Sequence, residues 1–194
     1  MKLLHLDSSA LGAHSVSRQL SAEIVSQLTH TWPGLTVNYH DLAAHPLPHW
    51  TSGATESSTD LGDQTMAAFQ EADVVVIGAP MYNFSIPSQL KAWVDRILVA
   101  GKTFRYTANG AEGLASGKQV IIASARGGAY HGTALSVMDF HESYLRSVFE
   151  FIGIPAITFI RAEGLALGDE QKAAGIQSAR RAIAQLSTPL TVAA

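Results

Sequence analysis

Cysteine is absent from all 194 residues. Its absence excludes disulfide bonds, thiolate catalysis and zinc or iron–sulfur centres that need cysteine ligands. Long apolar runs are missing as well. No stretch approaches the roughly 18 apolar residues of a membrane span, and the apolar run in MKLLHLDSSA is too short for a signal peptide. These features predict a cytoplasmic protein that does not enter a membrane.

Strong charge of either sign is also lacking. Lys and Arg number 13 against 16 Asp and Glu, which gives a formal net charge of −3. No basic surface for nucleic acid follows from this balance. Hydrophobic residues make up 47% of the chain, which is ample for a large core. We therefore expect one domain over residues 1–194, with no nucleic-acid partner.

Several signatures of nucleotide binding and hydrolysis do not occur. A P-loop requires GxxxxGK[ST], but Gly117 and Lys118 are followed by Gln119, and Glu112 stands where the first glycine belongs. Neither GxGxxG nor GxSxG is present. The sequence therefore offers no Rossmann fingerprint and no nucleophile elbow.

Histidines are the remaining metal ligands to consider. His45 and His49 have the spacing of a ligand pair on one helical face. Pro46 and Pro48 oppose a helix in this stretch. No metal site is expected here.

What the chain does contain is an alternation of short apolar runs and longer helix-like segments. The runs predict strands at Lys2–Leu6, Thr36–Tyr39, Val74–Ala79, Gln119–Ser124 and Ala156–Arg161. The longer segments predict helices at Ser15–Thr31, Gly62–Ala72, Pro87–Ala100, Thr133–Ile152 and Asp169–Ser187. Loops are expected at His45–Asp60 and Lys102–Gly117. Five strand–helix repeats predict an α/β fold, with helices on both faces of an open parallel sheet.

The first of three notable segments follows the first predicted strand. Within DSSALGAHSVS, residues 7–17, the serines are Ser8, Ser9, Ser15 and Ser17. A helix that starts near Ser15 has free backbone N–H groups and the positive end of its dipole there, and serine hydroxyls add donors. Such a segment can bind a phosphate without a lysine. A serine at a helix N-cap is also common without any ligand, so both interpretations stand.

The second segment, PMYNF, follows the third strand, Val74–Ala79. A loop that only reverses the chain would use Gly, Asn, Asp and Ser rather than aromatics. A planar cofactor would fit here, with Met81 and Tyr82 in contact with it and Asn83 hydrogen-bonded to its edge. Alternatively, Tyr82 and Phe84 are ordinary core or interface aromatics.

The third segment is ARGG, residues 125–128, after the fourth strand. Its adjacent glycines allow close backbone approach to a ligand. Arg126 either orients the loop, meets an anion or is solvated. Because ligands of an open parallel sheet bind beyond the carboxyl ends of the strands, the three segments belong to one site. Together they suit a phosphate at one end and a flat heterocycle at the other, the outline of flavin mononucleotide (FMN).

These residues resemble the FMN-dependent NADH:azoreductase family, whose members are also described as NADH:quinone oxidoreductases. The resemblance covers nearly the whole chain and is carried by SSALGAHSVS, PMYNF, IPSQLKAWVD, TFRYT, ARGG, FEFIGI and RAEG. It implies a flavodoxin-like fold, a doubly wound five-stranded parallel sheet in the order 2-1-3-4-5. It also implies a homodimer whose active sites lie at the interface.

Residue by residue, the resemblance implies two sets of contacts. The FMN contacts are Ser9, Ser15, Val16, Ser17, Met81, Tyr82, Asn83, Phe84, Ala125, Arg126, Gly127 and Gly128. The candidates for the substrate pocket are Phe104, Tyr106, Tyr130, His131 and Phe151. Val16 and Ala125 stand where relatives often carry polar residues, so these two positions are expected to act through backbone N–H groups. His131 also suits an ordinary surface position, and Phe151 suits a helix core.

The activity that the resemblance implies is reduction of quinones and azo compounds by NADH or NADPH. We expect a two-step, ping-pong hydride relay through bound FMN, with no dedicated catalytic acid or base because the flavin carries the chemistry. Two alternatives are an electron carrier of flavodoxin type, which turns over no small molecule, and a flavin-binding sensor.

Overall fold

The computed structural model describes residues 1–51 and 56–186, in which strands and helices alternate. The strands are β1 (Lys2–Asp7), β2 (Thr36–Asp41), β3 (Val74–Pro80), β4 (Phe104–Thr107), β5 (Gly110–Gly113), β6 (Gln119–Ala125) and β7 (Ile157–Ala162). The α-helices are α1 (Val16–Thr31), α2 (Glu56–Glu71), α3 (Ser88–Ile97), α4 (Phe140–Phe151) and α5 (Asp169–Ala184), and the 3-10 helices are η1 (Gly12–His14) and η2 (Ala134–Met138). No helix in the described ranges has the length and apolarity needed to cross a lipid bilayer.

Five strands form one parallel sheet in the order β2-β1-β3-β6-β7. β1 lies between β2 and β3, with Leu3 aligned to Val37 on one side and to Val74 on the other. Every residue of β3 is buried, because helices cover a parallel strand on both faces. The order confirms the predicted flavodoxin-like topology, with β6 and β7 as the fourth and fifth strands of the sheet.

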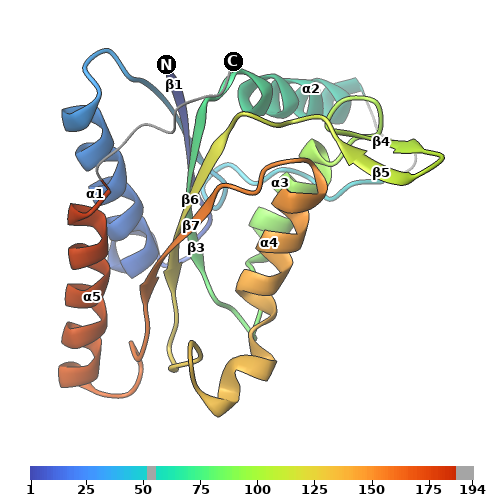
Figure 1. The fold of residues 1–194 in the computed structure, drawn as a ribbon. Helices are drawn as coiled ribbons and strands as arrows, with labels where there is room; N and C mark the ends of the chain where they lie inside the picture. Colours follow the sequence, from blue (N-terminus) through green and yellow to red (C-terminus); the bar gives the residue numbers. More distant parts are fainter. Residues whose placement is uncertain (52–55, 187–194) are drawn as a thin grey trace.

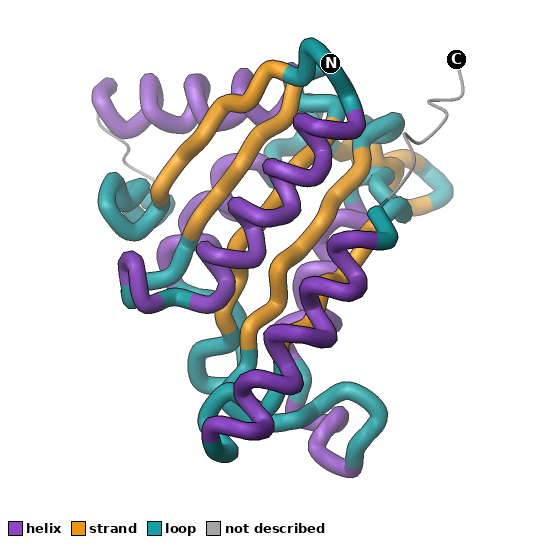
Figure 2. The backbone as a smooth tube through the Cα atoms, turned by 90° about the vertical axis from the view of Figure 1, so that its left-hand side faces the viewer, coloured by secondary structure: helices purple, strands orange, loops and turns teal. Residues whose placement is uncertain are grey.

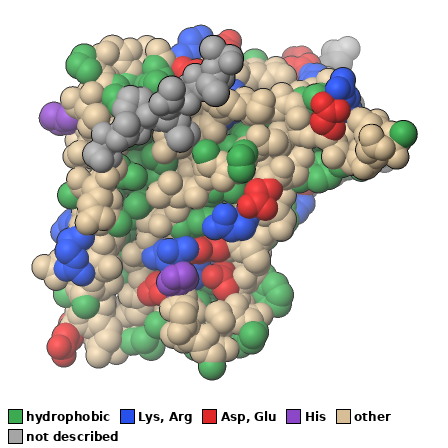
Figure 3. Space-filling model, in the orientation of Figure 1, with side chains coloured by type: hydrophobic (Ala, Val, Ile, Leu, Met, Phe, Trp, Pro, Cys, Tyr) green, Lys and Arg blue, Asp and Glu red, His purple; other side chains and the backbone are tan. Residues whose placement is uncertain are grey.

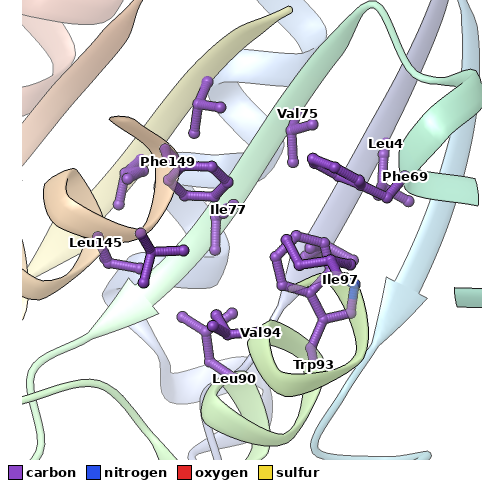
Figure 4. Close-up of a cluster of buried hydrophobic side chains, with 14 of the residues drawn as sticks. Leu4, Phe69, Val75, Ile77, Leu90, Trp93, Val94, Ile97, Leu145 and Phe149 are labelled. Carbon is purple, nitrogen blue, oxygen red and sulfur yellow. The ribbon is translucent and has the colours of Figure 1, made fainter. Parts of the chain in front are cut away.

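Helices cover the sheet on both faces. α1 and α5 lie side by side on one face, whereas α2, α3 and α4 lie on the other (Figures 1 and 2). Successive residues of β3 therefore enter different apolar clusters, Val76 under α1 and α5 and Ile77 on the opposite side. Figure 4 shows the second cluster, in which the rings of Phe69 and Trp93 meet edge to face with centroids 5.8 Å apart.

Three helices depart from the sequence prediction, of which α3 ends at Ile97, three residues before the predicted Ala100. α2 begins earlier than predicted, at Glu56, because its first turns are polar and lack the apolar periodicity that marks a helix. The single helix predicted over Thr133–Ile152 is divided into η2 and α4. Asp139 separates them, since its Oδ1 accepts hydrogen bonds from the N–H groups of His141 (3.1 Å) and Glu142 (3.0 Å) and so caps a new helix.

The remaining differences are at segment ends. The strands end one or two residues later than predicted. α5 ends at Ala184, and Ser187, the predicted end, lies outside the described residues. Of the loop predicted at His45–Asp60, residues 52–55 lie outside the described residues, and its last part belongs to α2.

The segment predicted as a loop at Lys102–Gly117 contains an antiparallel hairpin of β4 and β5. Its strands are short and mostly exposed, so they lack the apolar runs of the main sheet. The hairpin meets the end of α4 at Gly113, where a Cβ atom would overlap the backbone of Ile152 and Gly153. The N–H group of Ala115 also donates to the Ile152 carbonyl at 2.9 Å.

All five strands of the main sheet point the same way, so their carboxyl ends share one edge, low in Figure 1. The loops after β1, β3 and β6 leave from this edge. The hairpin of β4 and β5 and the last turn of α4 lie toward the opposite edge (Figure 1). The fold therefore brings together the three segments that the sequence singled out.

Candidate active site

The first loop, between β1 and α1, presents buried hydroxyl groups. Ser9, Ser15 and Ser17 are all buried, and the hydroxyls of Ser15 and Ser17 lie 3.0 Å apart. Ser15 is the N-cap of α1, where its Oγ accepts from the N–H group of Arg18 at 3.3 Å. Ser15 is therefore a helix N-cap, as one of the two interpretations of this segment predicted. Two further buried serines, Ser9 and Ser17, belong to the same loop.

Backbone donors accompany these hydroxyls. In the described part of the chain, nothing accepts a hydrogen bond from the N–H group of Val16 or Ser17, the first two residues of α1. Free N–H groups at a helix N-terminus, together with its dipole, bind anions. The first loop therefore fits a phosphate group, although it offers no lysine.

Arg18 follows the loop, but its positive charge is already engaged. Its guanidinium group makes two hydrogen bonds of 2.6 Å to the carboxylate of Asp41 at the end of β2. The same group donates to the carbonyl of Ser9 at 2.8 and 3.2 Å. The hydrogen bonds from Arg18 lower the pKa of Asp41 to about 2. Arg18 thus braces the loop from outside.

Asp7 is a buried carboxyl group beneath the same loop, and the sequence interpretation gave it no role. Ser21 Oγ donates to it at 2.8 Å and the Tyr39 hydroxyl at 3.1 Å. Burial raises the pKa of Asp7, and the hydrogen bond from Ser21 opposes the rise. Gly78 of β3 lies directly against it, since a Cβ atom there would overlap Asp7 Oδ1. The sequence did offer a signal for this buried group, because Asp7 is a carboxyl residue at the end of a mostly apolar strand.

The second loop contains a tight turn from Tyr82 to Ser85, closed by hydrogen bonds of 2.9 and 3.0 Å between their backbones. The two central residues, Asn83 and Phe84, have φ angles of 47° and 71°. This left-handed conformation is unfavourable for residues other than glycine, by roughly 1–2 kcal/mol for most of them. Such strain is typical of functional sites, and here it presents an asparagine and an exposed aromatic ring.

Tyr82 connects the second loop to the first. Its hydroxyl lies 3.1 Å from Ser9 Oγ and accepts a hydrogen bond from the Ala10 N–H group at 3.2 Å. Met81 connects the second loop to the third, because its N–H group donates to the Ala125 carbonyl at 2.8 Å. Hydrogen bonds therefore join all three loops into one surface.

The third loop is fixed through its carbonyl groups. They accept from consecutive N–H groups after β7, in the pairs Leu165 to Arg126 (3.1 Å), Ala166 to Gly127 (3.0 Å) and Gly164 to Gly128 (2.9 Å). By contrast, no described residue accepts from the N–H groups of Gly127 and Gly128. The loop therefore leaves a row of donors for a carbonyl-type oxygen.

The side chain of Arg126 points into the protein. It is 1% exposed and forms ion pairs with Asp139 (2.9 Å), Glu163 (3.1 Å) and Glu142. The interpretation of Arg126 as a solvated arginine is wrong. The anions it meets belong to the protein, and the partners lie 13 to 37 positions away, so no local sequence pattern indicates them.

The five candidates for the substrate pocket fall into two groups. Tyr130 and His131 follow the third loop after one residue, Ala129. Phe104, Tyr106 and Phe151 form an aromatic cluster, with the Phe104 ring 4.8 Å from Phe151 and 5.5 Å from Tyr106. This aromatic cluster belongs to the hairpin and the end of α4, toward the opposite edge of the sheet. One copy of the chain does not bring the two groups together.

Two cavities bear on the location of the site. A groove of about 560 Å³ adjoins the second loop and is lined in part by Tyr82, Asn83 and Tyr144. A larger cavity of about 630 Å³ lies between α2 and α3 and includes Trp50 and Lys102. We place the site at the loops rather than in the larger cavity, because free donors and backbone strain occur at the loops.

Metal ligands do not gather in the described residues, where no three His, Asp or Glu side chains are placed to share an ion. The donors at the carboxyl edge instead suit an organic ligand that combines a phosphate with a planar, carbonyl-bearing ring. FMN has these two features.

Comparison with known proteins agrees with the fold. Residues 1–186 match a family described as having a flavodoxin-like fold. An FMN-dependent NADH:quinone oxidoreductase of Sinorhizobium medicae (strain WSM419) is 54% identical over 198 residues, covering 95% of this chain and 96% of the relative. An FMN-dependent NADH:quinone oxidoreductase 1 of Xanthomonas axonopodis pv. citri (strain 306) is 56% identical over 184 residues, covering 92% and 93%.

A solved structure supports the same assignment. The azoreductase of Bacillus anthracis str. Sterne superposes with a TM-score of 0.88 at 26% sequence identity, covering 96% of this chain and 98% of that one. The family that the sequence motifs indicated is confirmed. The chain belongs to the flavodoxin-like family that includes these FMN-dependent NADH:quinone oxidoreductases.

Proposed function

We propose that this protein is an FMN-dependent NAD(P)H oxidoreductase that reduces quinones and azo compounds. The observation that carries the proposal is the convergence of three loops, with free N–H donors and buried hydroxyls, at one edge of the sheet. The names of relatives that are 54% and 56% identical over nearly their full length support the same activity.

Each loop has its own part in holding FMN. Ser9, Ser15 and Ser17 would hold the phosphate through hydroxyls, and Val16 would do so through its N–H group. Residues 81–84 would form one side of the site that holds the flavin ring, with Asn83 hydrogen-bonded to the edge of that ring. Residues 125–128 would contribute the N–H groups of the two glycines, while Arg126 itself supports the loop from within.

The chemistry that bound FMN supplies is a two-step relay, in which hydride passes from a nicotinamide to the flavin and then to the acceptor. The protein binds and orients the reactants. With FMN bound, the preorganised N–H donors of Gly127 and Gly128 would stabilise negative charge on its ring, and they would need no reorganisation to do so. Aromatic side chains hold the acceptor at reacting distance. No side chain is assigned as a catalytic acid or base.

The proposal includes a homodimer with the active sites at its interface. The aromatic cluster supports it, because Tyr106 is 76% exposed and Phe151 is 37% exposed, both toward the edge opposite the loops. Phe84 is another exposed aromatic residue, and it lies at the carboxyl edge. In a dimer, the aromatic cluster of one copy can pack over Phe84 of the other copy. Sedimentation equilibrium of the purified protein tests the dimer. Cytoplasmic location stays a prediction of the sequence.

Spectroscopy and steady-state kinetics test the function together. The purified protein should be yellow, or should become so with added FMN, and the released flavin should be FMN. Added quinone or azo dye should accelerate NADH oxidation, with parallel lines in double-reciprocal plots. A flavin-loaded protein that oxidises NADH no faster with these acceptors would instead be an electron carrier or a sensor. A protein that takes up no flavin would overturn the proposal.

A further inference from the structure

Arg126 is a cation that lies almost entirely inside the protein. Its partners come from separate elements: Asp139 and Glu142 from the start of α4, Glu163 from the end of β7, and Ser124 from β6, whose Oγ accepts from Nε at 3.0 Å. On the face drawn in Figure 3, basic and acidic side chains gather low on the molecule, near the carboxyl ends of β6 and β7. A charge is retained in such a place only when it is fully paired.

Glu163 links Arg126 to the backbone of the third loop. Its Oε1 atom accepts from Arg126 at 3.1 Å and also from the N–H groups of Tyr130 (2.9 Å) and His131 (3.0 Å). One carboxylate oxygen therefore fixes the chain just beyond Gly128. The carbonyl groups before it are held by the N–H groups after β7.

With both sides of the loop fixed, its donors stay in place. The N–H groups of Gly127, Gly128 and Ala129 have no acceptor in the described ranges. Their position therefore does not depend on a bond of their own. It depends on the carbonyl anchors and on the pair of Arg126 and Glu163.

Given the flavin site proposed above, we propose that Arg126 and Glu163 are positioning residues that hold these N–H groups against the flavin. Accepting a hydride adds two electrons and one proton to the ring, so the ring gains a negative charge. Fixed N–H donors stabilise that charge more than mobile ones do, because mobile donors must first be ordered. The pair thereby raises the reduction potential of bound FMN.

A direct electrostatic effect of the Glu163 charge on the flavin would change the reduction potential in the opposite direction. The sign of the change therefore distinguishes this effect from loop positioning. The cluster holds two arginines, Arg126 and Arg161, against three carboxylates, Asp139, Glu142 and Glu163. Removing the negative charge of Glu163 would by itself favour a negatively charged reduced flavin and raise the potential. Loss of loop positioning lowers it.

Three substitutions of Glu163 test the proposal in the FMN-loaded protein. Glu163→Ala removes the acceptor, and Glu163→Asp keeps the charge but withdraws the oxygen by one methylene. Both should weaken binding of reduced FMN relative to oxidised FMN by about tenfold, which lowers a two-electron potential by about 30 mV. Glu163→Gln loses the charge but keeps an acceptor oxygen, so its potential should stay near that of the wild type or above it.

The matched control is Arg161→Lys. Arg161 donates to Glu142 at 2.7 and 2.8 Å but makes no hydrogen bond to residues 126–131. This variant should keep the wild-type potential. Potentials are measured against a reference dye, and oxidised FMN affinity by fluorescence quenching. Thermal unfolding of each apoprotein verifies its fold, and Glu163→Asp carries the test alone where Glu163→Ala does not fold.

The outcomes are distinct from those for the proposed function. A wild-type protein that binds no FMN overturns the proposed function as a whole. If FMN binds but the potentials of Glu163→Ala and Glu163→Asp equal or exceed that of the wild type, only the positioning role is wrong. An equal fall in Glu163→Gln or in Arg161→Lys also overturns it, because a variant that keeps the acceptor oxygen, or one that leaves the loop untouched, would then lower the potential as much as loss of the anchor does.

Discussion

Replacing Asp41 by Asn is expected to lower the free energy of unfolding at pH 7 by about 1–2 kcal/mol. The substitution removes the carboxylate that Arg18 grips with two hydrogen bonds of 2.6 Å. It leaves the local turn intact, because an amide oxygen at this position still accepts from the N–H groups of Ala43 and Ala44, now 3.0 Å from Oδ1. The variant therefore isolates the ion pair.

The magnitude follows from the pKa of Asp41. Arg18 first, and then the N–H groups of Ala44 and Ala43, lower it from the ordinary 3.8 to about 2. This shift represents about 2.5 kcal/mol at about 1.4 kcal/mol for each pH unit, which is an upper bound for the ion pair. The side chain of Asp41 is 19% exposed and lies at the edge of the solvent, so screening reduces this value. About 1–2 kcal/mol remains, which for a chain of this size lowers Tm by roughly 2–8 °C.

The pH dependence has a definite sign. Asp41 has a depressed pKa in the folded state, so its contribution is complete above the unfolded pKa near 4 and is lost as the pH falls through about 2. Urea unfolding of the wild type and Asp41→Asn should therefore differ most at pH 5–7, and the difference should narrow steadily between pH 4 and pH 3. A difference that stays constant from pH 7 to pH 3 would refute the reasoning.

Glu112→Gln is the matched control. Arg105 grips Glu112 with two hydrogen bonds of 2.8 and 2.9 Å, but both side chains are about half exposed on the hairpin. Solvent screening should leave no measurable change in stability. If the two variants lose equal stability, burial of the Arg18–Asp41 pair is not what makes it effective.

Two further substitutions probe the loops. Gly78→Ala places a Cβ against Asp7 Oδ1 and 3.2 Å from the Ser17 carbonyl, so we expect a loss of about 1–3 kcal/mol by overpacking and a weaker FMN site; wild-type Tm and FMN affinity would contradict this. Tyr82→Phe removes the hydroxyl that meets Ser9 and Ala10, a loss of about 1 kcal/mol. The Kd for FMN, followed by fluorescence quenching, should rise about fivefold, and an unchanged Kd would exclude this link between the loops.

The main sheet was predictable because its signal is local. A strand such as β3, buried along its whole length, requires a continuous apolar run, and that run is visible at residues 74–77. The hairpin was missed because β4 and β5 are short and exposed, so packing imposes no apolar pattern on them. The break before α4 depends on one side chain, Asp139, and its residue type, which favours an N-cap over a helix interior, was the signal that could have indicated it.

The loops of the candidate site could be predicted from the sequence, but the side chains that hold those loops in place could not. Glycines and serines after apolar runs are local features, so the first and third loops could be recognised. The support of Arg126 comes from Glu142 and Glu163, 16 and 37 positions away, and only the folded sheet brings them together. The same holds for the aromatic cluster, whose members share an edge of the fold rather than a segment of sequence.

The contact at Gly113 has a consequence for any acceptor that approaches the aromatic cluster. Because two backbones meet there with no space for a side chain, the hairpin cannot swing away from the end of α4 without losing its seat on Gly153. The hairpin therefore keeps Phe104 next to Phe151 of α4, with the ring centroids 4.8 Å apart. In the proposed dimer, an acceptor that meets these rings would therefore find them already in place.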